Sequence, residues 1–283
     1  MPASLLVLGS ASRIGRNLGA VWRRAAPGGL MPVWHARQGG DLAWDMLAQP
    51  FPGGIAPGGV VLNLAGVTDA RAPMENNVTL ALAACRAAAE AGARHVFLLS
   101  SAAVYGAAAA HDMAEDDAVQ PLNPYGHAKR HMELCALDWA ADAKTPVTIL
   151  RLGNVAGADA LLGRAGLAWA GQKMSIDPVP GHPGGPVRSY IGSRSLADVL
   201  AGLASLALTG AELPSIVNIA AGPPVTMGSL LDAAGITWVY GPENPAVIPR
   251  VGLNTRRMQR LFPLAAEAAL PATMVAEWRE VGV

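Results

Sequence analysis

The chain carries little charge and few cysteines for its length. Charged residues make up 15% of 283 positions, and 21 basic residues balance 21 acidic ones, so the formal net charge is zero. Binding of nucleic acid or of an acidic membrane needs a basic patch, which nothing in this balance indicates. Cys85 and Cys135, the two cysteines, lie in helix-like segments. We interpret them as small core residues in a reducing compartment, not as a disulfide framework or a metal site.

Long apolar runs are missing as well. Charges and glycines interrupt the alanine-rich segments, so no stretch reaches the roughly 20 apolar residues of a membrane span. The N-terminal segment 1–8 has no basic region before its short apolar run, which argues against a signal peptide. The six histidines are scattered without the spacing of a metal site, so a metal hydrolase has no ligand cluster to support it. We expect a cytoplasmic protein with no metal, membrane or nucleic-acid partner.

Apolar residues are plentiful, at 52% of the chain, and suffice for a substantial core. Short continuous apolar runs, typical of strands buried on both faces, alternate with helical patterns. The expected strands are 4–8, 30–34, 59–64, 95–99, 147–150 and 215–219, and 42–46 is expected to be a short strand or a turn. The expected helices are 16–24, 74–91, 125–141, 196–208 and 227–235. These repeated units favour an α/β fold with a Rossmann-like, doubly wound parallel sheet. Proline within 30–34 predicts an edge or irregular strand there.

Composition suggests a division of the chain into two parts. We expect one domain at 1–157, completed by a strand near 215–220 and by the segment 188–208, and mainly a smaller lobe at 158–283. Residues 158–186 are rich in glycine and proline, as in a loop that covers a substrate. His182 within it is expected to be a loop residue, and the tryptophans, Trp169 among them, are expected to pack in the core.

A glycine-bearing turn follows the first expected strand directly. Gly9 and Gly15 bracket the turn, a helical pattern follows, and Ser12 takes the place of the middle glycine in a G-x-x-G-x-x-G pattern. In that context backbone N–H groups and the positive end of the helix can face a pyrophosphate. The alternative is an ordinary strand–helix turn.

The end of the second expected strand bears on the choice of cofactor. A carboxylate about 20 positions after the loop usually binds the ribose 2′-hydroxyl of NAD, and a nearby arginine accommodates the 2′-phosphate of NADP. His35 and Arg37 occupy this place, and no carboxylate follows until Asp41. We lean toward NADP over NAD, the alternative being that Arg37 is a solvated loop charge.

A serine, a tyrosine and a lysine supply candidate catalytic groups. Tyr125 and Lys129 are four residues apart, so on a helix they share one face. An ammonium beside a phenol lowers the pKa of the phenol, which can then exchange a proton with a carbonyl or alcohol oxygen. Ser101 follows the buried run 95–99 at the end of a strand. By itself the tyrosine–lysine spacing is also that of a solvated helix face.

Several ordered motifs strengthen this interpretation. They are Gly9-x5-Gly15, Asp45, Asn63-Leu-Ala-Gly66, Asn77, Ser100-Ser-Ala-Ala-Val-Tyr-Gly106, Asn123-Pro-Tyr-Gly-x-x-Lys129 and Arg151-Leu-Gly-Asn-Val-x-Gly157. Together they resemble the extended short-chain dehydrogenase/reductases of the NAD-dependent epimerase/dehydratase family. The resemblance implies that the domain at 1–157 binds NAD(P) and that 158–283 is mainly a substrate-binding lobe. Tyr125 is then implied to be the acid/base, Lys129 to lower its pKa and bind the nicotinamide ribose, and Ser101 to hold the substrate oxygen. The resemblance also implies cofactor contacts from Gly9, Ser12, Arg13, Ile14, Gly15, Asp45 and Ala65, and substrate contacts from Asn154 and Arg188.

Departures from the family pattern narrow the implied activity. Dehydratases of this group carry an Asp-Glu pair after the catalytic hydroxyl residue, where this chain has Ala102 and Ala103. We therefore expect an epimerase or reductase for a sugar-like substrate, with a nucleotide sugar as one candidate, and we do not expect a dehydratase. Ser189 and Gly192 replace an aspartate and a histidine beside Arg188. Arg188 could instead be a salt-bridged surface residue.

Two further expectations complete this interpretation. The resemblance implies a homodimer through the helices 74–91 and 125–141. A catalytically silent NAD(P)-binding scaffold or redox sensor is the alternative function, although such a protein has no chemical need for Ser101, Tyr125 and Lys129 together.

Overall fold

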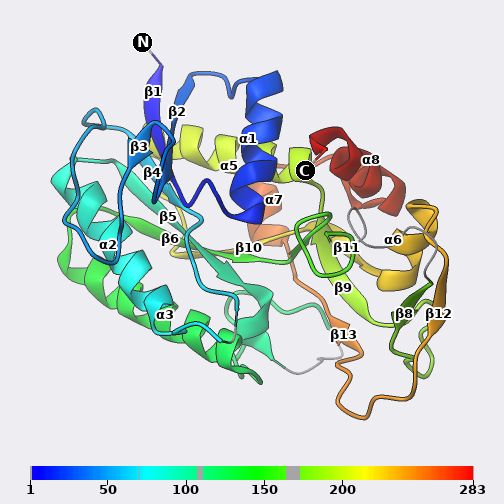
Figure 1. Ribbon diagram of the computed structural model, residues 1–283. Coiled ribbons are helices and arrows are strands. Elements are labelled where there is room, and N and C mark those ends of the chain that lie inside the picture. Colours follow the sequence, from blue (N-terminus) through cyan, green and yellow to red (C-terminus); the bar gives the residue numbers. More distant parts are fainter. Residues whose placement is uncertain (1, 70, 107–110, 164–172, 283) are drawn as a thin grey trace.

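A parallel sheet forms the centre of the computed structural model (Figure 1). The structure describes residues 2–69, 71–106, 111–163 and 173–282. Within those ranges the sheet has seven strands, all paired in parallel. Their spatial order is β10 (Ile216–Ile219), β6 (Val147–Leu152), β5 (His95–Ser101), β4 (Val60–Asn63), β1 (Ala3–Leu8), β2 (Leu30–Ala36) and β3 (Leu42–Ala43). This arrangement confirms the predicted Rossmann-like fold class, including the return of the 215–219 strand to the sheet.

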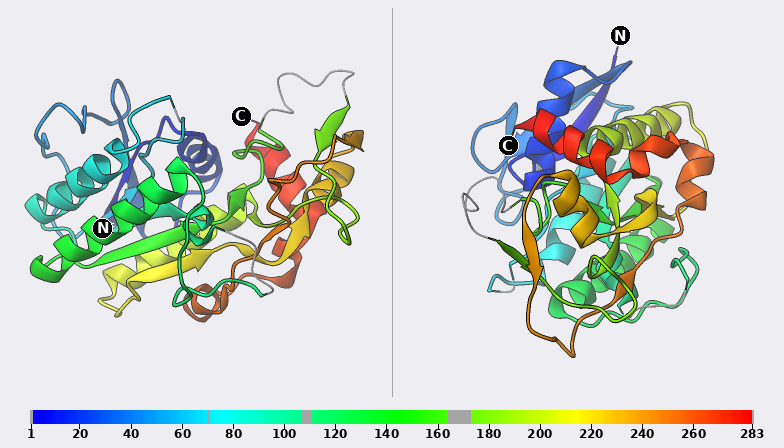
Figure 2. Two further views of the ribbon diagram at one scale, coloured as in Figure 1. Left: turned by 90° about the horizontal axis from the view of Figure 1, so that it is seen from below. Right: turned by 90° about the vertical axis from the view of Figure 1, so that its right-hand side faces the viewer.

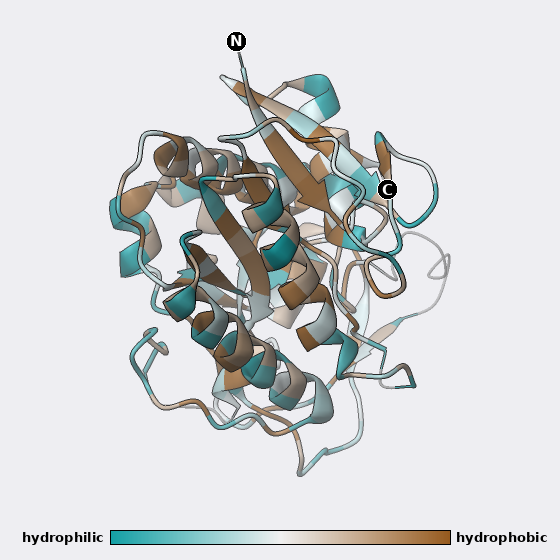
Figure 3. Cartoon of the chain, turned by 90° about the vertical axis from the view of Figure 1, so that its left-hand side faces the viewer, coloured by the Kyte–Doolittle hydropathy of each residue, from teal (hydrophilic) through white to brown (hydrophobic). Residues whose placement is uncertain are grey.

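Helices cover both faces of the sheet. On one side α1 (Arg13–Arg24) packs beside α5 (Ser193–Leu208), and on the other α2 (Asn76–Glu90) packs beside α3 (Pro124–Asp142) (Figure 1). In β1 the side chains alternate, so Leu5 and Val7 join the core under α1, whereas Leu6 and Leu8 join the core under α2. Figure 3 shows the resulting apolar strands between helices of mixed polarity. Burial on both faces explains the continuous apolar runs in the sequence.

The crossovers reverse direction at β1. From β1 the chain moves outward through β2 and β3, and then returns to the opposite side of β1 with β4. Ligands of doubly wound sheets bind outside the carboxyl ends of the strands at such a switch point. The fold therefore places a candidate site above Leu8 and Asn63, the last residues of β1 and β4.

Pro32 lies in a part of β2 that has one paired neighbour. In register, Pro32 lies opposite Leu5 of β1, whereas β3 pairs only with His35 and Ala36 at the far end of the strand. The proline therefore removes no hydrogen bond on the outer side of this part of β2. Around Pro32, β2 therefore forms the edge of the sheet, as predicted, and β3 is the outermost strand only beside the end of β2.

The second half of the chain adds a smaller lobe, seen beside the main sheet in Figure 2. In one small sheet β9 (Val187–Ile191) pairs with β7 (Asn154–Val155), β11 (Ala221–Thr226) and β13 (Arg250–Val251), and in another β8 (Met174–Ile176) pairs with β12 (Trp238–Tyr240). Its helices are α6 (Met227–Ala233), α7 (Arg256–Leu261) and α8 (Pro271–Val281), and short 3-10 helices occur at Ala102–Tyr105 (η1) and Ala266–Ala269 (η2). These short strands are too brief for their sequence pattern to reveal, and β8 interrupts the expected loop at 158–186.

Two expectations are not decided by this architecture. The division at residue 157 stays a prediction, and Trp169 lies outside the described residues.

Among the helices of the described part of the chain, none is both long enough and apolar enough to traverse a bilayer.

Candidate active site

The turn between β1 and α1 has the close backbone packing of a phosphate loop. Gly9 has a φ of +79°, and a Cβ built on it would lie 2.6 Å from the backbone nitrogen of Ala65. A Cβ on Gly15 would lie 2.6 Å from the carbonyl oxygens of Gly9 and Ser10. Only glycine fits at both positions, and this brings the N-terminus of α1 against the end of the sheet. The positive end of α1 then suits a pyrophosphate.

Ser12 can replace the middle glycine because its backbone is extended, with φ −66° and ψ 163°. Its Oγ accepts a hydrogen bond from the Gly15 amide at 3.0 Å and so caps α1. The next residue, Arg13, reaches across to the loop after β7. Its NH1 donates to the carbonyl oxygens of Ala158 at 3.3 Å and Asp159 at 3.2 Å. The phosphate loop is thereby tied to the segment at the entrance of the smaller lobe.

His35 supports this turn from below. The ring is buried, its Nδ1 accepts a hydrogen bond from the Gly9 amide at 3.1 Å, and its Nε2 lies 2.7 Å from the Trp44 carbonyl oxygen. A neutral ring protonated at Nε2 satisfies both contacts, and burial lowers the pKa of His35 below its usual value, against the hydrogen bond to Trp44. Because no ring nitrogen is left for a cofactor, we reassign His35 from cofactor contact to support of the Gly9 turn.

Arg37 is exposed, and its partner is Asp45. The Arg37 Nε lies 3.9 Å from the Asp45 Oδ2, and 73% of the arginine side chain is accessible to solvent. Asp45 also accepts a hydrogen bond from the Leu47 amide at 3.1 Å. A long exposed ion pair holds neither side chain strongly, so both can turn toward a ligand.

Tyr125 and Lys129 are positioned by the start of α3. Asn123 caps this helix by accepting a hydrogen bond from the Gly126 amide at 2.8 Å, and Pro124 occupies the first turn. The Lys129 Nζ donates to the carbonyl oxygen of Leu99 at 2.9 Å and lies 5.9 Å from the centre of the Tyr125 ring. The predicted helix places both side chains on one face, as expected, and that face meets the carboxyl end of β5.

The electrostatics differ from the expectation that Lys129 lowers the pKa of Tyr125. Burial raises the pKa of Tyr125 above its usual value, and a side-chain hydrogen bond with Ser101 opposes this rise. Burial also lowers the pKa of Lys129 to about 8, against the raising effect of the Glu133 carboxylate. Desolvation of the charged form is therefore the largest cause of the pKa shift at each of the two side chains. The raised pKa of Tyr125 favours its phenol form over its phenolate, and a phenol can donate a proton.

A cavity of about 490 Å³ brings the phosphate loop and α3 together. Its lining comes from the start of α1, the segment after β4, the end of β5, the start of α3 and the loop after β7. The lining residues are Ser12, Arg13, Ile14, Leu64, Gly66, Thr68, Leu99, Ser100, Tyr125, Lys129, Ala158, Asp159 and Ala160. Predicted site residues from two segments, Ser12 to Ile14 and Tyr125 with Lys129, thus face one space. The size and the glycine cradle fit part of a dinucleotide.

Other predicted residues lie beside this cavity without lining it. Ser101 caps η1 by accepting a hydrogen bond from the Ala103 amide at 3.2 Å, and Ala65 donates its amide hydrogen to Asn63 at 3.0 Å. Asn154 is half-buried and forms a side-chain hydrogen bond with Tyr190. Its contact with substrate therefore stays a prediction.

Arg188 belongs to the smaller lobe, and it forms no ion pair among the described residues. Its NH1 donates to the Val187 carbonyl oxygen and its NH2 to that of Ile248, each at 2.8 Å. Burial lowers the pKa of Arg188. The residues on either side of Ile248 line a second cavity of about 830 Å³, which prolines 178, 180 and 183 also line. The guanidinium is therefore fixed near a space large enough for part of a ligand.

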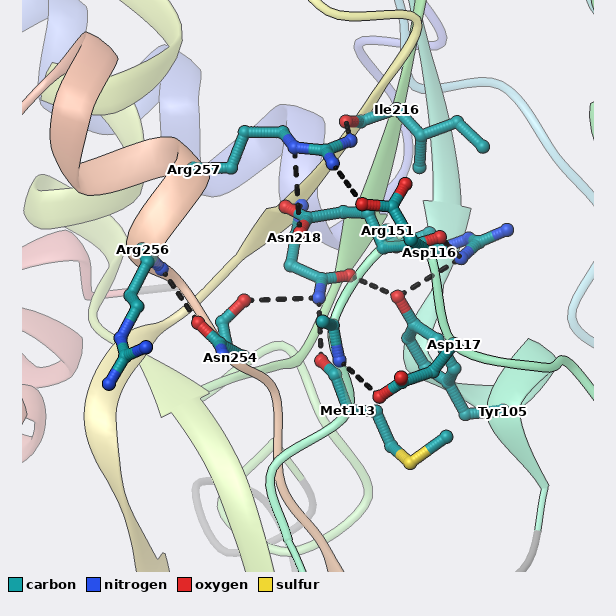
Figure 4. Close-up of polar contacts among 12 residues, drawn as sticks. Tyr105, Met113, Asp116, Asp117, Arg151, Ile216, Asn218, Asn254, Arg256 and Arg257 are labelled. Atoms are coloured by element: carbon teal, nitrogen blue, oxygen red, sulfur yellow. Dashed lines mark hydrogen bonds and ion pairs between the residues drawn. The ribbon is translucent and has the colours of Figure 1, made fainter.

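Sequence reasoning missed a buried polar network behind the site, and Figure 4 shows its part around Tyr105, Arg151 and Asn218. Arg151 of β6 donates from Nε to the Glu133 Oε1 at 3.0 Å and from NH2 to the Oε2 at 2.9 Å. Its NH1 donates to the hydroxyl of Tyr105 at 3.0 Å, and this hydroxyl donates to the Asn218 side chain at 2.7 Å. The signal was available, because Arg151 and Tyr105 fall within the motifs and a charge inside an apolar strand needs a partner. Within the described residues, no group of three or more histidine, cysteine or acidic side chains could hold a metal ion.

A family model and curated relatives resemble this chain in sequence. Residues 57–176 match the model of the NAD dependent epimerase/dehydratase family. A UDP-glucose 4-epimerase of Lactobacillus helveticus is 39% identical over 85 residues, which are 30% of this chain and 26% of that protein. A UDP-glucose 4-epimerase of Rhizobium meliloti (strain 1021) is 28% identical over 269 residues, with 81% of this chain and 80% of the relative covered. The match of higher identity thus covers about a quarter of the Lactobacillus helveticus protein, whereas the match of lower identity covers most of the Rhizobium meliloti protein.

Solved structures share the whole fold. A UDP-glucose-4-epimerase from Stenotrophomonas maltophila with bound NAD and formylated UDP-arabinopyranose has a TM-score of 0.80 at 18% identity, covering 99% of this chain and 98% of that one. An NAD-dependent NDP-hexosamine 5,6-dehydratase of tunicamycin biosynthesis has a TM-score of 0.74 at 17% identity, covering 98% of each chain. The fold therefore hosts both epimerases and a dehydratase. Residues 57–176 of this chain are thus similar to the NAD dependent epimerase/dehydratase family, and the whole chain shares the fold of the solved epimerase and dehydratase structures.

Proposed function

We propose that this chain is an NAD(P)-dependent epimerase or reductase that interconverts a carbinol and a carbonyl in a sugar-like substrate, of the nucleotide-sugar class. The observation that carries the proposal is the shared cavity, where the phosphate-loop residues Ser12 and Arg13 face Tyr125 and Lys129. A nicotinamide dinucleotide, when bound, accepts a hydride from the carbinol carbon and can return it. The protein must then move one proton and orient one oxygen.

Tyr125 is the group that we assign to proton transfer. As a neutral phenol it can protonate a carbonyl oxygen, and the reverse reaction requires its phenolate. The positive charge of Lys129 stabilises that phenolate, although the lysine is itself close to losing its proton. Ser101, already hydrogen-bonded to Tyr125, would orient the substrate oxygen.

The substrate class rests on the relatives and on Arg188. The two relatives are UDP-glucose 4-epimerases, and the solved epimerase contains a UDP-sugar. Arg188 uses two donors on backbone carbonyls, which leaves other N–H groups of its guanidinium for a diphosphate. Asn154 of β7 lies opposite Tyr190 of β9, the strand that also carries Arg188, and is proposed to contact the sugar.

The reaction type is proposed from side-chain chemistry. Elimination of a hydroxyl group needs an acid beside the reacting sugar, and Ala102 and Ala103 supply none at the places where dehydratases of the family carry acids. A dehydratase shares the fold, so it is this local chemistry, and not the architecture, that favours epimerisation or reduction.

The cofactor is proposed to be a nicotinamide dinucleotide. The solved structures of similar fold favour NAD, whereas the position of Arg37 favours NADP. The epimerase that shares the fold binds NAD. Arg37 could meet a 2′-phosphate, but only if it leaves Asp45. Titration of the protein with NADH and NADPH, followed by nicotinamide fluorescence, distinguishes the two.

A homodimer is proposed through α2 and α3. These helices pack side by side, and Leu134 on α3 leaves 49% of its surface exposed. The many alanines of α2 permit close helix packing. Sedimentation equilibrium of the wild type and of Leu134→Glu tests this assignment, since a charged side chain at the interface should yield a monomer.

Turnover of UDP-glucose or UDP-galactose by the wild type and by Tyr125→Phe tests the function. We expect the variant to lose activity while its NADH affinity stays nearly unchanged, because only the transferable proton is removed. Wild-type-like turnover by the variant would refute the mechanism. Binding of NADH without turnover of any sugar nucleotide by the wild type would favour the silent scaffold instead.

A further inference from the structure

Arg13 connects two walls of the cavity that contains the phosphate loop. It is the first residue of α1, and its NH1 donates to the carbonyl oxygens of Ala158 at 3.3 Å and of Asp159 at 3.2 Å in the loop after β7. All three residues line the cavity of about 490 Å³, and Arg13 is exposed to solvent. These two hydrogen bonds form the Arg13 bridge, which therefore crosses the cavity on its solvent side.

The acceptor side of the Arg13 bridge is firmly held. The carboxylate of Asp159 accepts hydrogen bonds from the Leu162 amide with Oδ1 at 3.0 Å and from the Tyr190 hydroxyl with Oδ2 at 2.9 Å. Leu162 and Tyr190 both have 0% of their surface exposed. The amides of Ala158 and Asp159 donate to the carbonyl oxygen of Val155 at 2.9 and 3.0 Å. The two acceptor carbonyls thus have a support in the core, at the end of β7 and on β9.

The donor side of the bridge can move. Arg13 forms no ion pair with the described residues, and its bridge consists of hydrogen bonds to neutral carbonyl oxygens. Such contacts of an exposed side chain are weak, because water competes for them. The bridge can therefore break and form again while the loop that accepts it stays in place.

We propose that the Arg13 bridge is a strap over the cofactor cavity, which must open before a dinucleotide enters or leaves and so slows both steps. The inference rests on the proposed function for the identity of the ligand. Through Asp159 the strap also reaches Tyr190 on β9 of the smaller lobe. Exchange of the dinucleotide is thus coupled to a contact between the two parts of the chain that form the site.

A strap differs in its kinetics from a side chain that only binds phosphate. A side chain that closes an entrance adds the same barrier to entry and to exit, so its removal raises both rate constants and changes the dissociation constant less than either. A guanidinium that only attracts the pyrophosphate acts otherwise, because without it entry becomes slower and exit faster. Rate measurements therefore separate the two roles of Arg13.

Stopped-flow fluorescence measures these rates with NADH, or with NADPH if only that dinucleotide binds the wild type. Mixing gives the entry rate constant, and displacement by an excess of the oxidised dinucleotide gives the exit rate constant. We expect Arg13→Ala to raise both about fivefold, since opening no longer breaks the hydrogen bonds of the bridge. Unchanged rates in this variant, or slower entry with faster exit, would overturn the proposal.

Arg16→Ala is the matched control. Arg16 lies on the same helix, and its NH1 donates to the Ala11 carbonyl oxygen within its own turn at 2.6 Å. The substitution removes the same charge from α1 and leaves the Arg13 bridge intact, so it should show no joint rise of entry and exit. A joint rise equal to that of Arg13→Ala would assign the effect to charge and overturn the strap.

Tyr190→Phe tests the support of the strap, because it removes one hydroxyl and alters neither the phosphate loop nor any charge. Asp159→Asn, which keeps an oxygen for the Leu162 amide, takes its place if that variant does not fold. We expect faster entry and exit in Tyr190→Phe, and no further rise when it is added to Arg13→Ala, since the support matters only while the bridge exists. Wild-type rates, or effects of the two substitutions that multiply, would overturn the role assigned to this support.

Failure of the proposed function has a different signature. If Tyr125→Phe keeps wild-type turnover, the proton-transfer role is wrong, whereas the exchange rates of Arg13→Ala still decide the role of the strap. If the wild type binds neither NADH nor NADPH, both proposals are overturned.

Discussion

Gly126 packs directly against Ala103. A Cβ built on Gly126 would lie 2.6 Å from the carbonyl oxygen of Ala103, and this contact joins the first turn of α3 to η1. Since Ser101 precedes η1 and Tyr125 precedes Gly126, the contact sets the distance between the two proposed catalytic side chains. The glycine after the tyrosine is therefore a steric requirement of the site.

Gly126→Ala should accordingly weaken both stability and turnover. We expect a loss of about 1–3 kcal/mol in the free energy of unfolding, because the added methyl group forces α3 away from a backbone oxygen. Chemical denaturation and a turnover assay measure the two effects. Gly28→Ala is the matched control, since a Cβ there meets nothing within 4 Å. Equal behaviour of the two variants would contradict the steric argument.

His35→Ala should weaken NADH binding, because the imidazole supports the Gly9 turn of the phosphate loop. The Gly9 amide loses its acceptor, and a lost hydrogen bond of about 1 kcal/mol corresponds to roughly fivefold in affinity. Fluorescence titration with NADH measures this change. An unaltered dissociation constant would show that the turn holds its shape without the imidazole.

Arg37→Ala should change the preference between the two cofactors. The exposed guanidinium can meet a 2′-phosphate, so we expect weaker NADPH binding and unchanged NADH binding. Parallel titrations with both cofactors decide the outcome. Unchanged affinity for NADPH would identify Arg37 as a solvated partner of Asp45.

Acid should destabilise the protein through its buried histidines. Burial lowers the pKa of His95 to about 4, and it also lowers that of His35. Below the usual histidine pKa of about 6.5, the unfolded chain takes up protons that the folded chain does not. The free energy of unfolding is therefore highest above this pH and decreases as the pH falls below it. For His95 the loss down to pH about 4 is of the order of 3 kcal/mol.

Thermal unfolding between pH about 7 and about 4 checks this prediction. His95→Gln should reduce the slope, because the amide can still meet the Thr148 hydroxyl that the imidazole contacts at 2.9 Å. A variant with the slope of the wild type would exclude His95 as a source of the acid sensitivity.

The repeated alternation of apolar runs and helical patterns was sufficient to predict the main sheet. Strands buried on both faces need no polar alternation, and glycine at 9 and 15 and proline at 124 mark turns and helix starts by local stereochemistry alone. Tyr125 and Lys129 could be paired in advance for the same reason, since four residues of helix place them on one face. The small strands β7, β8, β11, β12 and β13 were not predictable, because their pairing depends on partners distant in the chain.

Sequence by itself determined the residue types available to the site, the turn that can hold a phosphate, and the helix that presents the tyrosine and lysine. Tertiary structure alone decided their electrostatic state. Burial raised the pKa of Tyr125 where proximity to Lys129 had predicted the opposite, and it turned His35 from a candidate ligand into a support for Gly9. Glu133 and Arg151 became partners only because α3 packs across β6. Desolvation depends on every segment that surrounds a group, and no local pattern in the chain contains that information.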